Sequence, residues 1–164
     1  MAMPSPQNRP ALVLIDGFSL AFRAYYAMPP DMTAPDGTPI NAVYGMASML
    51  IKFIDEYSPK ALVACFDTPK PTFRKEIYPE YKAHRPPPPE DFIPQVPIMK
   101  ELFQIFDIPV YEMEGFEADD ILGTMAKLAE SQNFRALIVT GDRDAYQLID
   151  DNIHILTTKK GISD

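Results

Sequence analysis

The chain has 164 residues, of which 46% are hydrophobic, so its length and composition fit one globular domain. Its one cysteine excludes a disulfide framework within the chain and suits a reducing cytoplasm, and no apolar run approaches the roughly 18 residues that a membrane span needs. The net charge of −8 argues against non-specific nucleic-acid binding by the whole surface.

The predicted elements alternate between strands and helices. Residues 1–10 lack the apolar stretch of a secretory signal and are expected to form a disordered tail. Apolar runs without clean alternation predict buried strands over residues 11–15, 61–66, 108–111 and 136–139, and a fifth strand over 153–156. Apolar residues at helical spacing predict helices over residues 40–54, 98–106 and 121–129, and a short helix over 143–149. This alternation predicts an α/β fold with a parallel sheet and right-handed crossovers.

A connection of about 25 residues, from 68 to 92, interrupts the alternation, and connections of that length are usually functional or disordered. Residues 70–85 carry a net charge of +3, which leaves −11 for the rest of the chain. The cations alternate with aromatic rings, a pattern that suits single-stranded nucleic acid, although a solvated loop remains the alternative. The residues concerned are Arg74, Lys75, Tyr81, Lys82 and Arg85. Arg23 is either a further phosphate contact or a surface residue.

Acidic residues end or soon follow four of the predicted strands. Because parallel strands end at one edge of the sheet, where ligands bind in such folds, we expect these acids to gather there. They are Asp16, Asp67, Glu117, Asp119, Asp120, Asp142 and Asp144. Two like charges about 4 Å apart repel by roughly 4 kcal/mol at an effective dielectric of 20, and several such pairs rival the stability of a small domain. Divalent cations relieve this repulsion.

Oxygen-only ligands favour Mg²⁺ or Mn²⁺ over Zn²⁺, and carboxylate-bound Mg²⁺ is typical of phosphodiester hydrolysis. A purely structural interpretation exists for each acid group taken alone. Glu117, Asp119 and Asp120 would cap a helix, and Asp142 and Asp144 would stabilise a turn. The four placements together favour a metal site.

Several short motifs occur in an order and spacing that closely resemble the 5′→3′ exonuclease domains of bacterial DNA polymerases I. They are Leu14-Ile15-Asp16-Gly17, Val43-Tyr44-Gly45, Phe66-Asp67, Thr72-Phe73-Arg74, Tyr81-Lys82-Ala83-His84-Arg85-Pro86, Glu117-Ala118-Asp119-Asp120 and Thr140-Gly141-Asp142-Arg143-Asp144. Those domains belong to the flap endonuclease family. The resemblance covers residues 11–164 and implies a PIN-like (resolvase-like) three-layer fold, with helices on both faces of the sheet and a basic arch over about residues 68–92.

The resemblance also implies roles for individual residues. Two Mg²⁺ or Mn²⁺ ions are implied, the first held by Asp16, Asp67, Glu117 and Asp119 with Asp120 close by, the second partly by Asp142 and Asp144. Arg23, Arg74, Lys82 and Arg85 are implied as phosphate contacts, and Tyr81 as a ring that packs on the DNA. The implied substrates are DNA with a 5′ flap, a nick or a single-stranded 5′ end, and RNA primers in RNA–DNA hybrids, in replication and repair in the cytoplasm near the nucleoid.

In the family, a helix–hairpin–helix DNA-binding part and further metal-site aspartates follow the point that corresponds to Asp164, as does the polymerase. We therefore expect residues 1–164 to bind metal but to cleave flaps weakly, or to be an inactive fragment that keeps the fold. A stand-alone PIN-type ribonuclease is an alternative enzyme, although it does not need the long arch. A phosphoaspartate receiver or phosphatase is another alternative, but it requires a lysine or Ser/Thr where this chain has acids.

Overall fold

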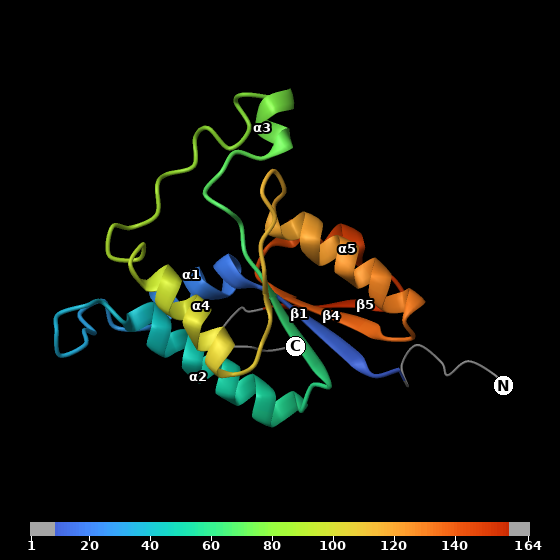
Figure 1. The fold of residues 1–164 in the computed structure, drawn as a ribbon, viewed down its shortest axis with the longest axis horizontal. Coiled ribbons are helices and arrows are strands. Elements are labelled where there is room, and N and C mark those ends of the chain that lie inside the picture. The colour runs from blue at the N-terminus through green and yellow to red at the C-terminus, as the bar shows by residue number, and fades with distance from the viewer. Residues whose placement is uncertain (1–8, 158–164) are drawn as a thin grey trace.

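A five-stranded parallel sheet forms the centre of the computed structural model, which describes residues 9–157 (Figure 1). The strands are β1 (Ala11–Asp16), β2 (Ala61–Cys65), β3 (Val110–Tyr111), β4 (Arg135–Thr140) and β5 (Ile153–Thr157). Neighbouring strands all pair in parallel, in the order β3-β2-β1-β4-β5. The α/β fold is thus confirmed, and all five predicted strands are present. The strand order reverses between β1 and β4, which is the position where open α/β sheets bind ligands.

Helices cover both faces of the sheet and give the fold three layers (Figure 1). The longer helices are α1 (Gly17–Ala27), α2 (Asn41–Tyr57), α4 (Gln95–Ile105) and α5 (Ala118–Ser131), and two short ones are α3 (Phe73–Ile77) and the 3-10 helix η2 (Arg143–Leu148). Val13 and Ile15 of β1 pack with α1, α2 and α4, whereas Leu14 packs with α5 on the opposite face. This burial on both faces explains why the strand sequences show no polar alternation. No helix within residues 9–157 is long and apolar enough to cross a membrane.

Helix α1 was not predicted from the sequence. It begins at Gly17, directly after β1, and the Asp16 side chain caps it by accepting the Ser19 N–H at 3.0 Å. Gly17 is needed at this position because a Cβ atom there would lie 2.4 Å from the ring of Phe66. The close approach brings α1 against the end of β2, so the first strand and first helix meet at the edge where the acids lie.

Helix α4 begins at Gln95, three residues before its predicted start, and Gln95 also completes α2. The residue before α2, Ile40, has no capping side chain. The fully buried Gln95 replaces that cap, since its Oε1 accepts the Ala42 N–H at 2.8 Å while its Nε2 donates to Asn41 Oδ1 at 2.8 Å. One buried amide therefore joins the starts of two helices.

The connection between β2 and α4 carries the five-residue helix α3 and projects away from the sheet (Figure 1). Near its start, the Phe73 N–H donates to the Gly115 carbonyl at 2.9 Å, and the Phe73 ring lies 5.6 Å from that of Phe116. At its end, buried Phe92 stacks on Phe22 with ring centroids 4.3 Å apart. Both ends are thus anchored, whereas residues 75–90 are mostly exposed.

The predicted disordered tail, residues 1–10, falls outside the described residues except for its last two. Arg9 donates to Asn152 Oδ1 at 3.0 Å, and the Pro10 carbonyl accepts the Arg135 N–H at 3.0 Å. The Pro10 contact extends the pairing of β1 with β4, and Arg9 contacts the residue that precedes β5.

Substituting Gly17→Ala is predicted to destabilise the fold by about 1–3 kcal/mol, because the added methyl group overlaps the buried Phe66 ring. Urea unfolding measures the change. The matched control is Gly123→Ala in α5, where the new Cβ lies 3.5 Å from Leu148 and helix propensity favours alanine by about 1 kcal/mol. Equal stability of the Gly17→Ala variant and the parent chain would contradict the close approach.

Candidate active site

Asp16 is a buried acid at the end of β1, held by groups from two other elements. Its Oδ1 accepts the Ser19 N–H of α1, and its Oδ2 accepts the Thr140 hydroxyl of β4 at 2.7 Å. Burial raises the pKa of Asp16 above its ordinary value, against these hydrogen bonds, and the charges of Asp67 and Asp142 act in the same direction as burial. The ionised form of Asp16, at the switch point of the sheet, is therefore disfavoured by its surroundings.

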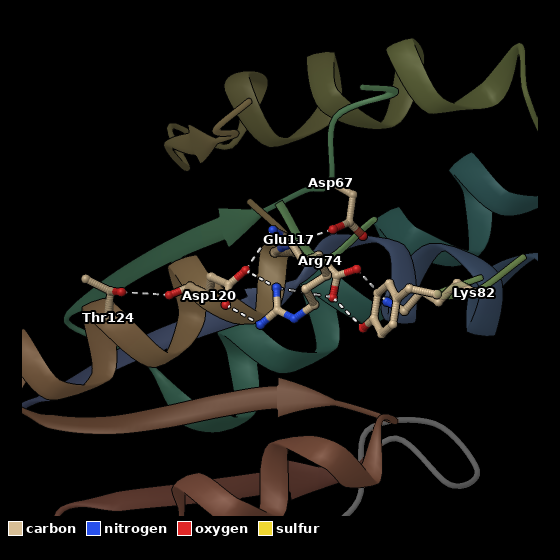
Figure 2. A network of polar contacts seen from close by, with 8 residues as sticks. Asp67, Arg74, Lys82, Glu117, Asp120 and Thr124 are labelled. Atoms are coloured by element: carbon tan, nitrogen blue, oxygen red, sulfur yellow. Dashed lines mark hydrogen bonds and ion pairs between the residues drawn. The ribbon is translucent and has the colours of Figure 1, made fainter. Parts of the chain in front are cut away.

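Asp67 follows β2 and connects that strand to α5. Its Oδ1 accepts the N–H of Ala118, the first residue of α5, at 2.7 Å (Figure 2). An anionic side chain at this position is favoured by the unpaired N–H groups and the dipole of the helix. The contact brings the start of α5 against the acid-bearing edge of the sheet.

Glu117 immediately precedes α5 and is almost fully buried. Two side chains of the arch contact its carboxylate (Figure 2). The Lys82 ammonium lies 2.8 Å from its Oε1, and the Tyr81 hydroxyl donates to its Oε2 at 3.2 Å. These contacts bring the middle of the basic segment onto the acids, although the two regions are about 35 residues apart in sequence.

Asp119, in the first turn of α5, shows that the acids are close enough to repel one another. Burial raises its pKa to about 6, and the charges of three other carboxylates add to the shift. These carboxylates belong to Asp16, Asp142 and Asp67. The folded chain therefore stores electrostatic repulsion at this edge.

One cavity of about 780 Å³ collects these groups. Its acids are Asp16, Asp67, Glu117, Asp119 and Asp142, and its cations are Arg23, Lys82, Arg85 and Arg143. The rings of Phe18, Phe22 and Tyr26 from α1 also line it. Sequence reasoning missed Arg143 and the three rings as site residues. The rings could have been found from their four-residue spacing, which places them on one face once residues 18–26 are taken as a helix.

The structure does not bring all seven predicted acids into this cavity. Asp120 and Asp144 line a second cavity of about 340 Å³ together with Arg74, and Asp119 borders both cavities. Arg74 forms a two-pronged ion pair with Asp120 and lowers the pKa of that carboxyl (Figure 2). Two predicted acids and one predicted DNA contact therefore lie beside the main cavity.

The acids fit a hard divalent cation by their chemistry, because five carboxylates and no nitrogen or sulfur ligand line the main cavity. Their present placement is not a closed coordination shell, since no three His, Cys, Asp or Glu side chains within residues 9–157 converge closely enough to hold a metal ion. Lys82 instead provides positive charge beside Glu117.

Comparison with known proteins places this site in a family. Residues 11–164 match the model of the 5′-3′ exonuclease N-terminal resolvase-like domain. The chain is 45% identical over 157 residues to DNA polymerase I of Mycobacterium tuberculosis and 42% identical over 157 residues to that of Bacillus subtilis. These alignments cover 95% and 96% of the chain but only 17% and 18% of those polymerases. The chain belongs to the family of 5′-3′ exonuclease N-terminal resolvase-like domains.

A solved structure of similar fold is the bacteriophage T5 D15 flap endonuclease in a complex with DNA and metal ions. The TM-score is 0.71 at 20% sequence identity, and the match covers 92% of this chain and 56% of that one. This similarity confirms the predicted PIN-like fold.

We predict that substituting Asp119→Asn makes the metal-free chain more stable near pH 7 by about 1 kcal/mol, a figure reduced for solvent screening of a partly exposed group. Because its folded pKa is raised, Asp119 costs no stability below about pH 4, and the cost grows as pH rises to about 6. Urea unfolding in EDTA across this range measures the difference.

The matched control is Asp55→Asn, which removes an acid from the exposed surface of α2 that does not line the cavity. An Asp119→Asn effect of equal size at both ends of the window would contradict the electrostatic origin of the raised pKa.

Proposed function

We propose that this chain hydrolyses phosphodiester bonds at the 5′ ends of DNA, acting on flaps, nicks and single-stranded 5′ ends, and on RNA primers in RNA–DNA hybrids. The observation that carries this proposal is the main cavity, in which five carboxylates and four cations face one space at the switch point of a parallel sheet. Carboxylates suit divalent cations, whereas arginine and lysine suit phosphates. A phosphodiester with bound cations matches both groups.

The family supports this chemistry, and the T5 flap endonuclease of similar fold was solved with DNA and metal ions. The chain spans about one-sixth of the polymerases that it matches, so it is compared with their N-terminal part alone. We propose a polymerase domain as a partner in a longer natural chain, and a location in the cytoplasm near the nucleoid.

Mg²⁺ or Mn²⁺ is the proposed cofactor, held by Asp16, Asp67, Glu117 and Asp119 with Asp142 beside them. When bound, such ions stabilise the charge that develops on the phosphate and lower the pKa of a water molecule. We propose two ions per site, and the T5 flap endonuclease of similar fold was solved with metal ions. Asp120 and Asp144 border the second cavity, so we assign them supporting positions around the ion set rather than places on the wall of the main cavity.

The cations of the site bind and orient the substrate. Lys82 and Arg85 come from the arch, Arg23 from α1 and Arg143 from η2, so three segments of the chain supply cations that can contact phosphates. Lys82 now pairs with Glu117, and a phosphate that enters the cavity offers it an alternative partner. Tyr81 donates to the same carboxylate and holds the arch over the acids.

Cleavage of a 5′-labelled flap in the presence of Mn²⁺ tests the proposed function. The chain is predicted to release the flap at a slow but measurable rate, and Asp67→Ala is predicted to lower that rate by at least about 100-fold, because it removes a carboxylate of the cavity and the partner of the Ala118 N–H.

The matched control Asp55→Ala removes an exposed acid of α2 and should leave the rate unchanged. Single-stranded RNA of the same length tests the ribonuclease alternative. Faster cleavage of that RNA than of the DNA flap, or residual flap cleavage unaffected by Asp67→Ala, would contradict the proposal.

A further inference from the structure

We propose that Arg74 is a positioning residue, which acts through Asp120 to hold the first turn of α5, rather than a phosphate contact. The inference rests on the proposed function, because that turn supplies Glu117 and Asp119 to the cavity. It assigns Arg74 a different role from the one that the sequence predicts.

The contact between Arg74 and Asp120 is a bidentate ion pair (Figure 2). Arg74 Nη1 lies 2.6 Å from Asp120 Oδ2, and Nη2 lies 2.7 Å from Oδ1. Both side chains are less than one-third exposed, at 30% and 24%. Pairs of this geometry are among the strongest charge-assisted hydrogen bonds, and they fix the orientation of the carboxylate.

Asp120 carries this orientation to the start of α5. Its Oδ2, the oxygen closest to Arg74, also accepts the Glu117 N–H at 2.9 Å. The next amide, that of Ala118, donates to Asp67. Two successive N–H groups at the start of the helix therefore donate to two carboxylates, and Arg74 fixes the orientation of one of these carboxylates, that of Asp120.

Arg74 is also tied to the base of the arch. Its guanidinium lies 4.7 Å from the centroid of the Phe73 ring, and Phe73 is anchored to Gly115 and Phe116. Arg74 thus connects the anchored end of the arch to α5. It does not line the main cavity, whereas Lys82 and Arg85 do, so a phosphate in that cavity meets the latter two residues first.

The direction in which cation affinity changes when Arg74 is replaced distinguishes a positioning role from a purely electrostatic effect. Arg74 Nη1 lies 3.8 Å from Glu117, so removing the guanidinium takes positive charge away from the acids and, by charge alone, strengthens cation binding. Releasing Asp120 instead loosens the turn that carries Glu117 and Asp119, and this weakens cation binding. The proposal predicts net weakening.

The experiment compares Arg74→Gln, Asp120→Asn and the double variant, with Lys75→Gln as a control that removes an exposed cation from the same short helix. Mn²⁺ alone is titrated by electron paramagnetic resonance, and amide hydrogen exchange is followed at Glu117 and Ala118. We expect each single variant to weaken Mn²⁺ binding about fivefold and to speed exchange at both amides about tenfold, with the double variant no worse than either single one.

Lys75→Gln should leave exchange at both amides unchanged, and Arg74→Lys should restore the parent behaviour only in part, because lysine lacks the planar fork. Tighter Mn²⁺ binding by Arg74→Gln, unchanged exchange at Glu117, or additive effects in the double variant would overturn the proposal. A parent chain that binds no Mn²⁺ would count against the proposed function instead, and amide exchange would still decide the role of Arg74.

The salt dependence of binding to a 5′-flap oligonucleotide gives a second discrimination. If Arg74 contacts a phosphate, Arg74→Gln lowers the slope of log affinity against log salt by about 0.7 to 0.9. If Arg74 is a positioning residue, Arg74→Gln leaves that slope unchanged while it weakens binding of the cation, so a reduced slope would overturn the proposal.

Discussion

Repulsion between buried carboxylates is the constraint on which the rest of this site depends. Parallel pairing brings the ends of β1, β2 and β4 to one edge. Burial is the main cause of the raised pKa values of Asp16 and Asp119, and the charges of neighbouring carboxylates add to both shifts. The chain offsets the repulsion with groups that donate hydrogen bonds. Backbone N–H groups at the starts of α1 and α5 donate to Asp16 and Asp67, while Lys82 forms an ion pair with Glu117.

These compensating contacts explain why the arch lies where it does. The basic segment is anchored at both ends, through Phe73 and Phe92, and its middle reaches the acids through Lys82. Lys82 and Arg85 line the cavity from the arch, which places phosphate-binding groups opposite the carboxylates. The side chains that offset the charge of the acids are thus the same ones that are proposed to contact DNA. A bound cation would replace Lys82 as the partner of the carboxylates, and a phosphate would replace Glu117 as the partner of Lys82.

The strands and the gathering of acids were predictable, because apolar runs followed by acids have one natural arrangement in a parallel sheet. Helix α1 was missed because its apolar face is largely aromatic and alanine-rich and it starts at a glycine. The separation of Asp120 and Asp144 from the main cavity was not predictable either, since it depends on the directions in which α5 and η2 leave the sheet. Contacts far apart in sequence, such as Arg74 with Asp120, leave no local pattern.

Thermal unfolding of the chain near neutral pH, with and without Mn²⁺, tests most directly whether the acid cavity is a divalent-cation site. A cation that binds only the folded chain stabilises it, by about 2.7 kcal/mol at 100 times its dissociation constant. The account predicts that Tm rises with Mn²⁺ concentration but not with NaCl of equal ionic strength, and that Asp16→Asn removes most of the rise. A Tm that responds equally to both salts, or a rise that survives Asp16→Asn unchanged, would contradict it.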